Sequence, residues 1–424
     1  MTKIKKLIFS IMFLGLIISL SSCDFHFEKL FSSDDTKETT DNKEKEESNT
    51  GNETTDNKEK EPENTGTGTE GNEGNTTDDN TSKPIGDKIN EIIGNIENEI
   101  IVDNPTDNEK TNEEELKIKD YILDYNNYYA YQKLGEIPVV GEDLQTIYSQ
   151  AFEEAKVVLT SADDYTTTSF NMREGDVTVS RNYYVLDPIK INDDKIKSGS
   201  FTIEMAVSAI MEMIYDNPLF YFLTPGYLKS TDSVYLTLID EYATAEARTI
   251  MNNNILAMIS DFKTNNNYES MSNYKKIETI NKYISNKISY AKDSSNNPED
   301  AYWAHNLEGF VNSTYNKGVC ECYAKACSLL TNVVGIDSLL VTGLASSGGS
   351  TGGHAWNYVK LDDKWYGLDV TWNDSDSIMQ IGNGNYFLVG SNKMSQDHTP
   401  YGQTYGTSFR IEFPTLETHS YSIL

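Results

Sequence analysis

The stretch GVCECYAKA, residues 318–326, places Cys320 at the start of an apolar helical pattern. Further along the chain, His354 lies in the stretch GHAWN and Asp369 in the stretch WYGLDVTW. A thiol is a weak nucleophile until its proton is removed, and an imidazole oriented by a carboxylate can remove it. These three residues are therefore the candidate catalytic group of the chain.

The apolar pattern predicts a helix over residues 320–334, with Cys320 at its N-terminus. Unpaired N–H groups and the helix dipole favour a thiolate there, and the same amides could stabilise an oxyanion. Taken alone, such a cysteine is more often a small buried apolar residue. Cys322 and Cys327 are badly placed on this helix for a disulfide. The three thiols with His354 could instead bind a metal, but side chains two positions apart on a helix diverge, so no metal is predicted.

The best hairpin signal joins residues 355–361 and 364–372 through a turn of two aspartates. This register places His354 one diagonal step from Asp369 on the same sheet face, within reach of a hydrogen bond. Taken alone, His354 could be a core histidine and Asp369 a solvated residue at a strand edge. A charge inside an apolar strand needs a partner, however, so the spacing predicts a His–Asp pair.

The three stretches resemble the core motifs of the transglutaminase-like superfamily, and the similarity covers about residues 265–400. The resemblance implies a papain-like fold, in which the helix bearing the nucleophile packs on an antiparallel sheet. It implies that Cys320 is the nucleophile, His354 the base and acid, and Asp369 the orienting carboxylate, with no cofactor. One residue departs from the pattern, because Cys322 stands where this subgroup usually has glycine.

Other residues are candidates for the cleft. In the same family an oxyanion-hole side chain lies upstream of the nucleophile, and Tyr302, Trp303 and Asn306 are the candidates here. Trp356 is expected in the core or the cleft wall, and His398 could line the cleft, although a structural role is favoured for it.

The expected fold class is α+β, with an accessory α/β subdomain at residues 117–265, mostly helical, and the catalytic domain at residues 266–424. Periodicity predicts helices at residues 144–158, 203–214, 243–262 and 274–288, and strands at residues 177–185, 233–240, 338–342 and 386–389. The Gly/Ser-rich residues 346–353 are expected to be mobile.

Residues 1–22 have the pattern of a secretory signal peptide. Three lysines precede a mostly apolar run at residues 7–20, which is short for a membrane span of ~20 residues. The sequence LSSC that follows resembles a bacterial lipobox, which implies cleavage before Cys23 and lipid on that residue. An uncleaved anchor or a soluble secreted product is the alternative.

Residues 23–116 are predicted to be a disordered stalk. Residues 31–116 hold 26 acidic residues and 8 lysines, and the segment ETTDNKEKE occurs twice. Such a composition cannot bury enough apolar area to offset chain entropy. The stalk supplies more than half of the chain's net charge of −31, so this charge says little about the substrate. No basic cluster indicates nucleic-acid binding.

The sequence thus predicts a lipid-anchored cysteine acyl-transfer enzyme on the outer face of the cell membrane. It would act on amide bonds of peptides or proteins, with cell-wall peptide as one candidate substrate. Water as acceptor gives a hydrolase, which is favoured, and a lysine amine gives a cross-linking transglutaminase. A non-catalytic surface binding module is the second class, supported by Cys322 alone. The oligomeric state is left open.

Overall fold

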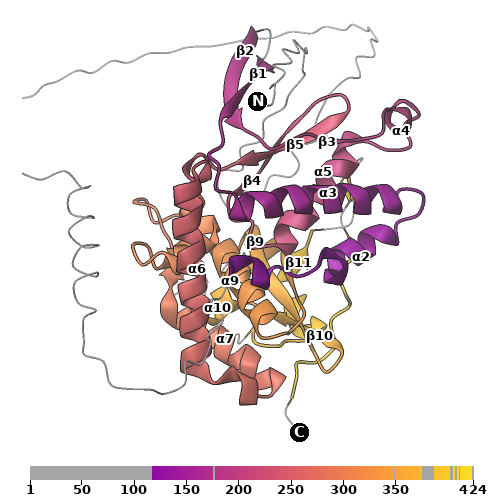
Figure 1. The fold of residues 1–424 in the computed structure, drawn as a ribbon. Coiled ribbons are helices and arrows are strands. Elements are labelled where there is room, and N and C mark those ends of the chain that lie inside the picture. The colour runs from indigo at the N-terminus through magenta and orange to yellow at the C-terminus, as the bar shows by residue number, and fades with distance from the viewer. Residues whose placement is uncertain are drawn as a thin grey trace, which may run out of the picture. The chain divides into compact units, whose positions relative to one another are not determined.

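The computed structural model describes residues 117–422, apart from residues 175–176, 348, 375–385, 402–403, 406–407 and 410. The predicted signal peptide, Cys23 and the stalk lie outside the described residues. Helices and antiparallel sheets are combined in an α+β fold, which confirms the predicted fold class (Figure 1). None of the described helices is both long and apolar enough to cross a membrane.

The region before the nucleophile helix consists of helices around a small sheet. Its helices are α2 (Tyr129–Gly135), α3 (Gly141–Thr160), α4 (Asp193–Lys197), α5 (Ile203–Asp216), α6 (Ala245–Asn266), α7 (Asn273–Lys287) and α8 (Leu307–Val311), with short 3-10 turns η2 (Ile118–Tyr121), η3 (Tyr125–Asn127), η4 (Asp240–Tyr242), η5 (Tyr268–Ser270) and η6 (Tyr302–His305). Its strands are β1 (Thr167–Glu174), β2 (Val177–Tyr184), β3 (Ile189–Lys190), β4 (Leu223–Lys229), β5 (Ser233–Leu238) and β6 (Ser289–Tyr290). Strands β3, β5 and β4 form one sheet, whereas β1 and β2 form a separate ribbon.

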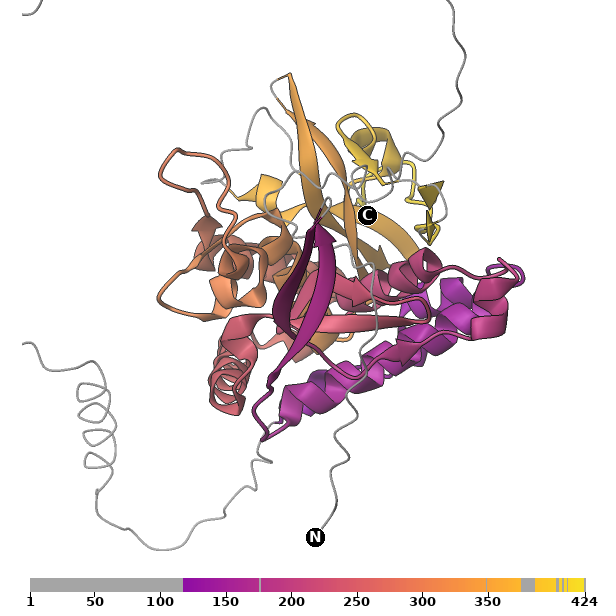
Figure 2. The ribbon, with the colours of Figure 1, turned by 90° about the horizontal axis from the view of Figure 1, so that it is seen from above.

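The region around the candidate site is a helix packed on a second sheet. Its elements are β7 (Lys317–Gly318), α9 (Cys320–Val333), β8 (Ser338–Ser347), β9 (Ser350–Leu361), β10 (Lys364–Leu368), α10 (Val370–Asn373), α11 (Ser391–Met394), β11 (His398–Pro400), β12 (Thr404–Tyr405) and β13 (Ser408–Phe409). The sheet is antiparallel, in the order β10-β9-β8-β11, and α9 packs against β8 and β9. Figure 2 shows the tip of the β8–β9 hairpin extending away from α3.

The predicted hairpin register is confirmed. Leu361 pairs with Lys364, and the two turn residues Asp362 and Asp363 have φ values of 52° and 61°, which suit a tight turn between twisted strands. The strand does not continue to residue 372, however. Its end is set by Asp369, whose side chain caps the short helix α10.

Two further stretches of this region contain structure that the sequence did not indicate. Residues 346–353 were expected to be mobile, and most of them are strand, because β8 and β9 remain paired as far as Ser347 and Ser350. Residues 386–389 were expected to be a strand, but they make a single bridge, between Val389 and Gly367. Leu388 has a φ of 49°, which is incompatible with a continuous strand.

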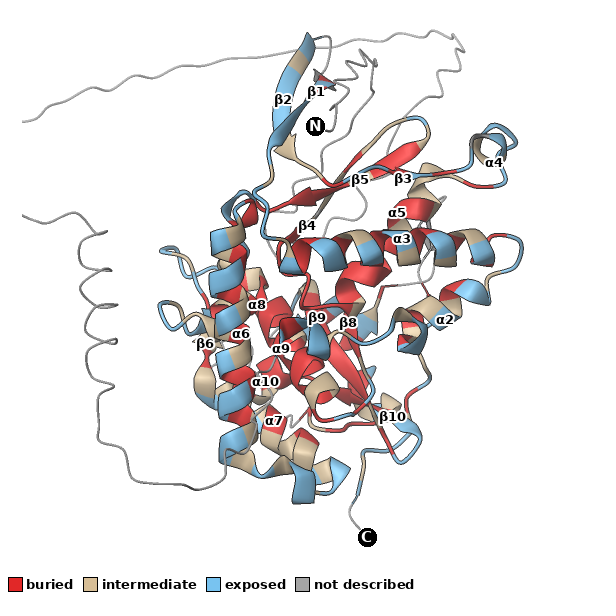
Figure 3. Cartoon of the chain, viewed as in Figure 1, coloured by how far each residue is buried: buried red, intermediate tan, exposed pale blue. Residues whose placement is uncertain are grey.

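One hydrophobic cluster joins the two regions. It includes Leu144 on α3, Ile210 on α5, Leu330 on α9 and Val359 on β9, all of them almost fully buried. Figure 3 shows exposed residues along one side of α6, whereas the α9–β9 centre is mostly buried. Helix α9 therefore lies in a rigid, close-packed environment.

Candidate active site

His354 and Asp369 form the buried pair that the sequence predicts. The His354 Nε2 atom lies 2.8 Å from Asp369 Oδ2, and the two side chains are 3% and 0% exposed. An ionised carboxylate can only accept hydrogen bonds, so Nε2 carries the hydrogen. The neutral form of His354 therefore has its basic lone pair on Nδ1, the nitrogen that remains for a substrate or a thiol.

Asp369 is held in its ionised form. Burial alone would raise the pKa of its carboxyl, but the neighbouring His354 and His398 side chains bring that pKa well below the usual range. The second oxygen, Oδ1, accepts the Trp372 backbone N–H at 3.0 Å. The carboxylate is thus fixed from both oxygens and can orient an imidazole without taking its proton.

Cys320 is the first residue of α9, as predicted, and it is 4% exposed. Two hydrogen-bonded contacts fix this helix to the elements that carry the pair. Asn357 on β9 donates from Nδ2 to the Ala324 carbonyl at 3.1 Å. The Tyr323 hydroxyl donates to Asp374 Oδ2 at 2.5 Å, just beyond α10. The nucleophile candidate therefore begins a helix that is tied both to the strand of His354 and to the helix that Asp369 caps.

The other two thiols on α9 are buried and belong to no disulfide. Burial raises the pKa of Cys322 to about 12 and raises that of Cys327 well above its usual range. Gly318 explains how Cys322 fits, because a Cβ atom on residue 318 would lie 2.5 Å from the Cys322 Sγ atom. The φ of Gly318 is not positive, so the glycine provides space for Cys322 and is not needed for a left-handed conformation.

A charged cluster lies directly beside Cys320. Glu321 is buried, with Oε1 2.8 Å from Lys325 Nζ and Oε2 3.2 Å from His305 Nδ1. Burial would raise the pKa of Glu321, but Lys325 and then His305 lower it to about 2. Lys325 also donates to the His305 carbonyl at 3.1 Å, so the cluster links η6 to α9. Sequence reasoning did not identify it.

The structure gives the oxyanion candidates different surroundings. Asn306 is buried, its Nδ2 donates to the Tyr221 carbonyl at 2.5 Å, and its Oδ1 accepts the Leu307 N–H at 2.7 Å. Its amide is therefore used within the fold. Trp303 stacks on Tyr315 with ring centroids 4.2 Å apart, and Tyr302 is 37% exposed.

His398 is the functional candidate whose position the sequence did not give. Its Nε2 atom lies 3.1 Å from Asp369 Oδ2, and its ring lies edge-on to Trp356 and 4.5 Å from the ring of Trp372. Trp356 is buried and also stacks near His354, so it forms the wall behind the pair. The sequence indicated only that His398 could line the cleft, with a structural role favoured.

The donor set His354, Asp369 and His398 could hold a metal ion. One ligand atom from each residue lies within 4.8 Å of the others, and all three side chains are buried. Both Nε2 atoms already donate to Asp369, so an ion would have to replace two protons. Hydrogen bonding accounts for the arrangement as it stands.

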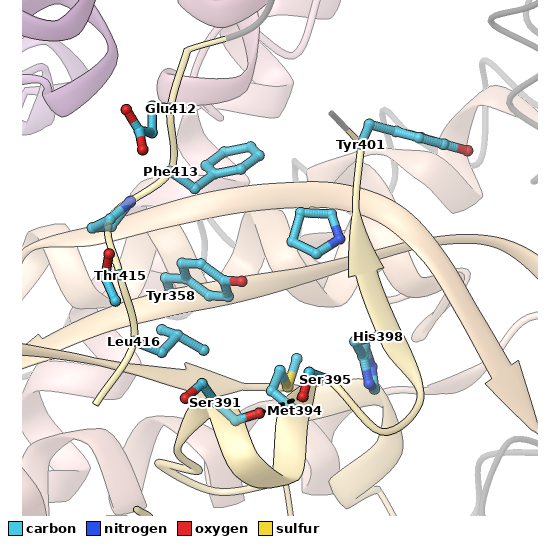
Figure 4. Close-up of a pocket in the computed structure, with 12 residues that line it drawn as sticks. Tyr358, Ser391, Met394, Ser395, His398, Tyr401, Glu412, Phe413, Thr415 and Leu416 are labelled. Atoms are coloured by element: carbon cyan, nitrogen blue, oxygen red, sulfur yellow. Dashed lines mark hydrogen bonds between the residues drawn. The ribbon is translucent and has the colours of Figure 1, made fainter. Parts of the chain in front are cut away.

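A pocket of about 350 Å³ lies next to His398 (Figure 4). Tyr358 of β9 and Met394 of α11 line it, together with Phe413 and Leu416 from the C-terminal segment. Through His398 the pocket adjoins the Asp369 carboxylate that His354 also contacts.

A comparison with known protein families matches the central part of the chain. Residues 263–370 match the sequence profile of the transglutaminase-like superfamily. These residues are a transglutaminase-like domain. The domain contains Cys320, His354 and Asp369, which confirms the family that the motifs indicated.

Several solved structures resemble part of this chain. One is described as a TGase, with 18% identity and a TM-score of 0.28 over 38% of this chain and 45% of the other. Another is the periplasmic domain of TgpA from Pseudomonas aeruginosa bound to ethylmercury, with 14% identity and a TM-score of 0.22 over 35% and 60%. The chain thus spans less than two thirds of either structure. Among curated proteins, none matches it.

Proposed function

We propose that the protein is a cysteine acyl-transfer enzyme that acts on amide bonds of peptides or proteins. The observation that carries this proposal is the buried His354–Asp369 pair on elements that are hydrogen-bonded to the helix beginning at Cys320. The pair leaves Nδ1 of His354 as the base, and the helix N-terminus favours a thiolate. The membership of this region in the transglutaminase-like superfamily supports the same chemistry.

The proposed reaction has two steps. The Cys320 thiolate attacks the amide carbonyl carbon, and as the C–N bond breaks the His354 imidazolium gives its proton to the leaving amine. The product of this step is a thioester. In the second step His354 removes a proton from the acceptor, the acceptor bonds to the carbonyl carbon, and the thiolate leaves. Asp369 fixes the imidazole orientation throughout.

Water is the proposed acceptor, which makes the enzyme a peptidase or amidase. A lysine amine as acceptor would make it a cross-linking transglutaminase. Incubating the protein with a glutamine-containing peptide and an amine probe separates the two activities. Release of ammonia or of peptide fragments without incorporation of the probe is the expected result, and stable incorporation would show a transferase.

The thiolate itself can be tested without a known substrate. The rate of alkylation of the protein by iodoacetamide at mildly acidic pH should be high, because a thiolate paired with an imidazolium persists there. Cys320→Ser should abolish this fast labelling, whereas Cys322→Ser should retain it, because the raised pKa of Cys322 keeps that thiol protonated. Slow labelling that is equal at all three thiols would favour a non-catalytic binding module.

We also propose that the enzyme is anchored by lipid on Cys23 and acts outside the cell, with cell-wall peptide as one candidate substrate. The basis is the apolar run followed by LSSC in the sequence. In a bacterial host, the protein should be found in the membrane fraction and should incorporate a labelled fatty acid. Cys23→Ser should remove the label, and a labelled Cys23→Ser protein would contradict the proposed anchor.

A further inference from the structure

The proposed triad has a second imidazole on its carboxylate. Asp369 Oδ2 lies 2.8 Å from His354 Nε2 and 3.1 Å from His398 Nε2, and its side chain is fully buried. Because the carboxylate only accepts, both histidines must donate a hydrogen to the same oxygen. The carboxylate that would stabilise a charged His354 is therefore shared between two rings.

The other nitrogen of His398 also faces a carboxylate. Its Nδ1 atom lies 2.7 Å from Asp397 Oδ1. A bare Nδ1 would direct its lone pair at the lone pairs of that oxygen, so a proton must lie between the two atoms. Two neighbours of the Asp397 carboxylate, one hydrogen-bond donor and one cation, decide which atom holds this proton.

Those neighbours favour an ionised Asp397. The Tyr386 hydroxyl donates to Asp397 Oδ2, and Lys393 Nζ lies 4.0 Å from the same oxygen and 3.1 Å from the Tyr386 hydroxyl. A donor and a cation both stabilise the carboxylate form, which leaves the proton on His398. The ring then has a hydrogen on each nitrogen and carries a positive charge.

We propose that His398 is a cationic positioning residue of the active site, held as an imidazolium between Asp369 and Asp397. It does not touch the reacting atoms. It fixes the orientation of Asp369 and offsets part of its negative charge, and its ring centroid lies 5.5 Å from that of His354. This role adds a fourth residue to the proposed Cys–His–Asp group. Its importance for catalysis rests on the proposed function.

The charge has a direct consequence for His354. A buried carboxylate with no other partner would stabilise the His354 imidazolium strongly, and an imidazolium that cannot release its proton is a poor general base. A cation on the same oxygen weakens that stabilisation, because the negative charge of Asp369 is then shared between two donors. Removing the cation should therefore strengthen the hydrogen bond from His354 Nε2 to Asp369 Oδ2.

Nuclear magnetic resonance of the full chain labelled with ¹⁵N and ¹³C in its five histidines gives the test. The ring ¹⁵N signals of His398 should show both nitrogens protonated at neutral pH. In His398→Gln, whose amide can still donate to Asp369 but carries no charge, the ¹H signal of the His354 Nε2–H group should move downfield, because its hydrogen bond to Asp369 becomes stronger. His419→Gln, at an exposed position, is the matched control and should leave that signal unchanged.

A bare nitrogen on His398, or a His354 Nε2–H signal in His398→Gln equal to that of the control, would overturn the inference. Should His398→Gln fail to fold, Asp397→Asn provides the second variant. His398 should then lose one ring proton, and the His354 Nε2–H signal should move downfield by a smaller amount. These signals do not depend on the thiol. Slow alkylation of Cys320 in the wild-type protein would contradict the proposed function and leave the charge on His398 to be judged separately.

Discussion

Two buried carboxylates lie around the candidate nucleophile, and they have different partners. Glu321 is paired with Lys325 and His305, whereas Asp369 is paired with His354 and His398. A lysine keeps its charge over the whole physiological range, but an imidazole gains or loses its charge near neutral pH. Glu321 therefore always has one charged partner in Lys325, which also donates to the His305 carbonyl of η6, whereas both partners of Asp369 are imidazoles whose charge depends on a proton.

The largest expected difference between the clusters is in catalysis. Asp369→Asn should lower the rate of Cys320-dependent turnover by about 10³- to 10⁴-fold, because an amide cannot hold the same imidazole tautomer or stabilise its charge. The fold should survive, because asparagine also caps helices well and residue 369 caps α10. Turnover rates and melting temperatures of the purified variants provide the measurement.

Glu321→Gln is the matched variant for that experiment. It should retain turnover within about tenfold, because Glu321 has no contact with His354 or Asp369 among the described ion pairs. Equal losses in the two variants would contradict the separation of the clusters into a structural and a catalytic one.

The second difference is in stability. Glu321→Gln should lower the free energy of unfolding at neutral pH by about 3 kcal/mol, because it leaves the Lys325 side chain, which is only 14% exposed, without its ionic partner. Glu278 also contacts two lysines, Lys275 and Lys282, but on the exposed side of α7. Glu278→Gln should cost less than about 1 kcal/mol, since solvent screens such pairs. Urea unfolding of both variants measures the two losses of unfolding free energy. Similar losses in Glu321→Gln and Glu278→Gln would contradict the predicted difference between the buried and the exposed carboxylate.

The same carboxylate predicts how stability depends on pH. The pKa of Glu321 is lowered from 4.5 to about 2 in the folded protein, so its contribution to stability is complete above the unfolded value. This contribution should be lost as the pH falls from about 4.5 towards 2, because the unfolded chain then takes up the proton first. Unfolding measured across that range should be flatter in Glu321→Gln than in the wild-type protein. An identical slope would show that Glu321 is not the group responsible.

The contrast between the clusters also explains what the sequence could predict. The His354–Asp369 pair follows from a hairpin with a two-residue turn, because the turn alone fixes the register. The partner His398 lies on β11, beyond β8 from the strand of His354, and no local pattern encodes that pairing. Gly343 of β8 pairs with His354 of β9. A Cβ atom on residue 343 would lie 2.6 Å from the Trp356 ring, so the close packing at this point also depends on a residue of another strand.

The Glu321 cluster was missed for a similar reason. Its Lys325 is one helical turn away and was accessible to sequence reasoning, but its His305 comes from η6, which reaches α9 through tertiary packing.

Asn306 shows the opposite case. An asparagine directly before a short apolar helix is a typical N-cap, and this local signal could have identified its structural role. The extent of strand in residues 346–353 could not be read from composition, because long-range pairing overrides the Gly/Ser preference.

The smallest expected effect concerns the thiol that replaces the usual glycine. Gly318→Ala should lower the free energy of unfolding by about 2 kcal/mol, because the added Cβ atom would lie 2.5 Å from the Cβ and Sγ atoms of Cys322. Gly352→Ala is the control, since its Cβ atom would meet nothing within 4 Å. The double variant with Cys322→Gly should relieve the clash and recover part of the loss, apart from about 1 kcal/mol for a glycine inside a helix. No recovery in denaturant unfolding of the double variant would mean that Cys322 is not what residue 318 accommodates.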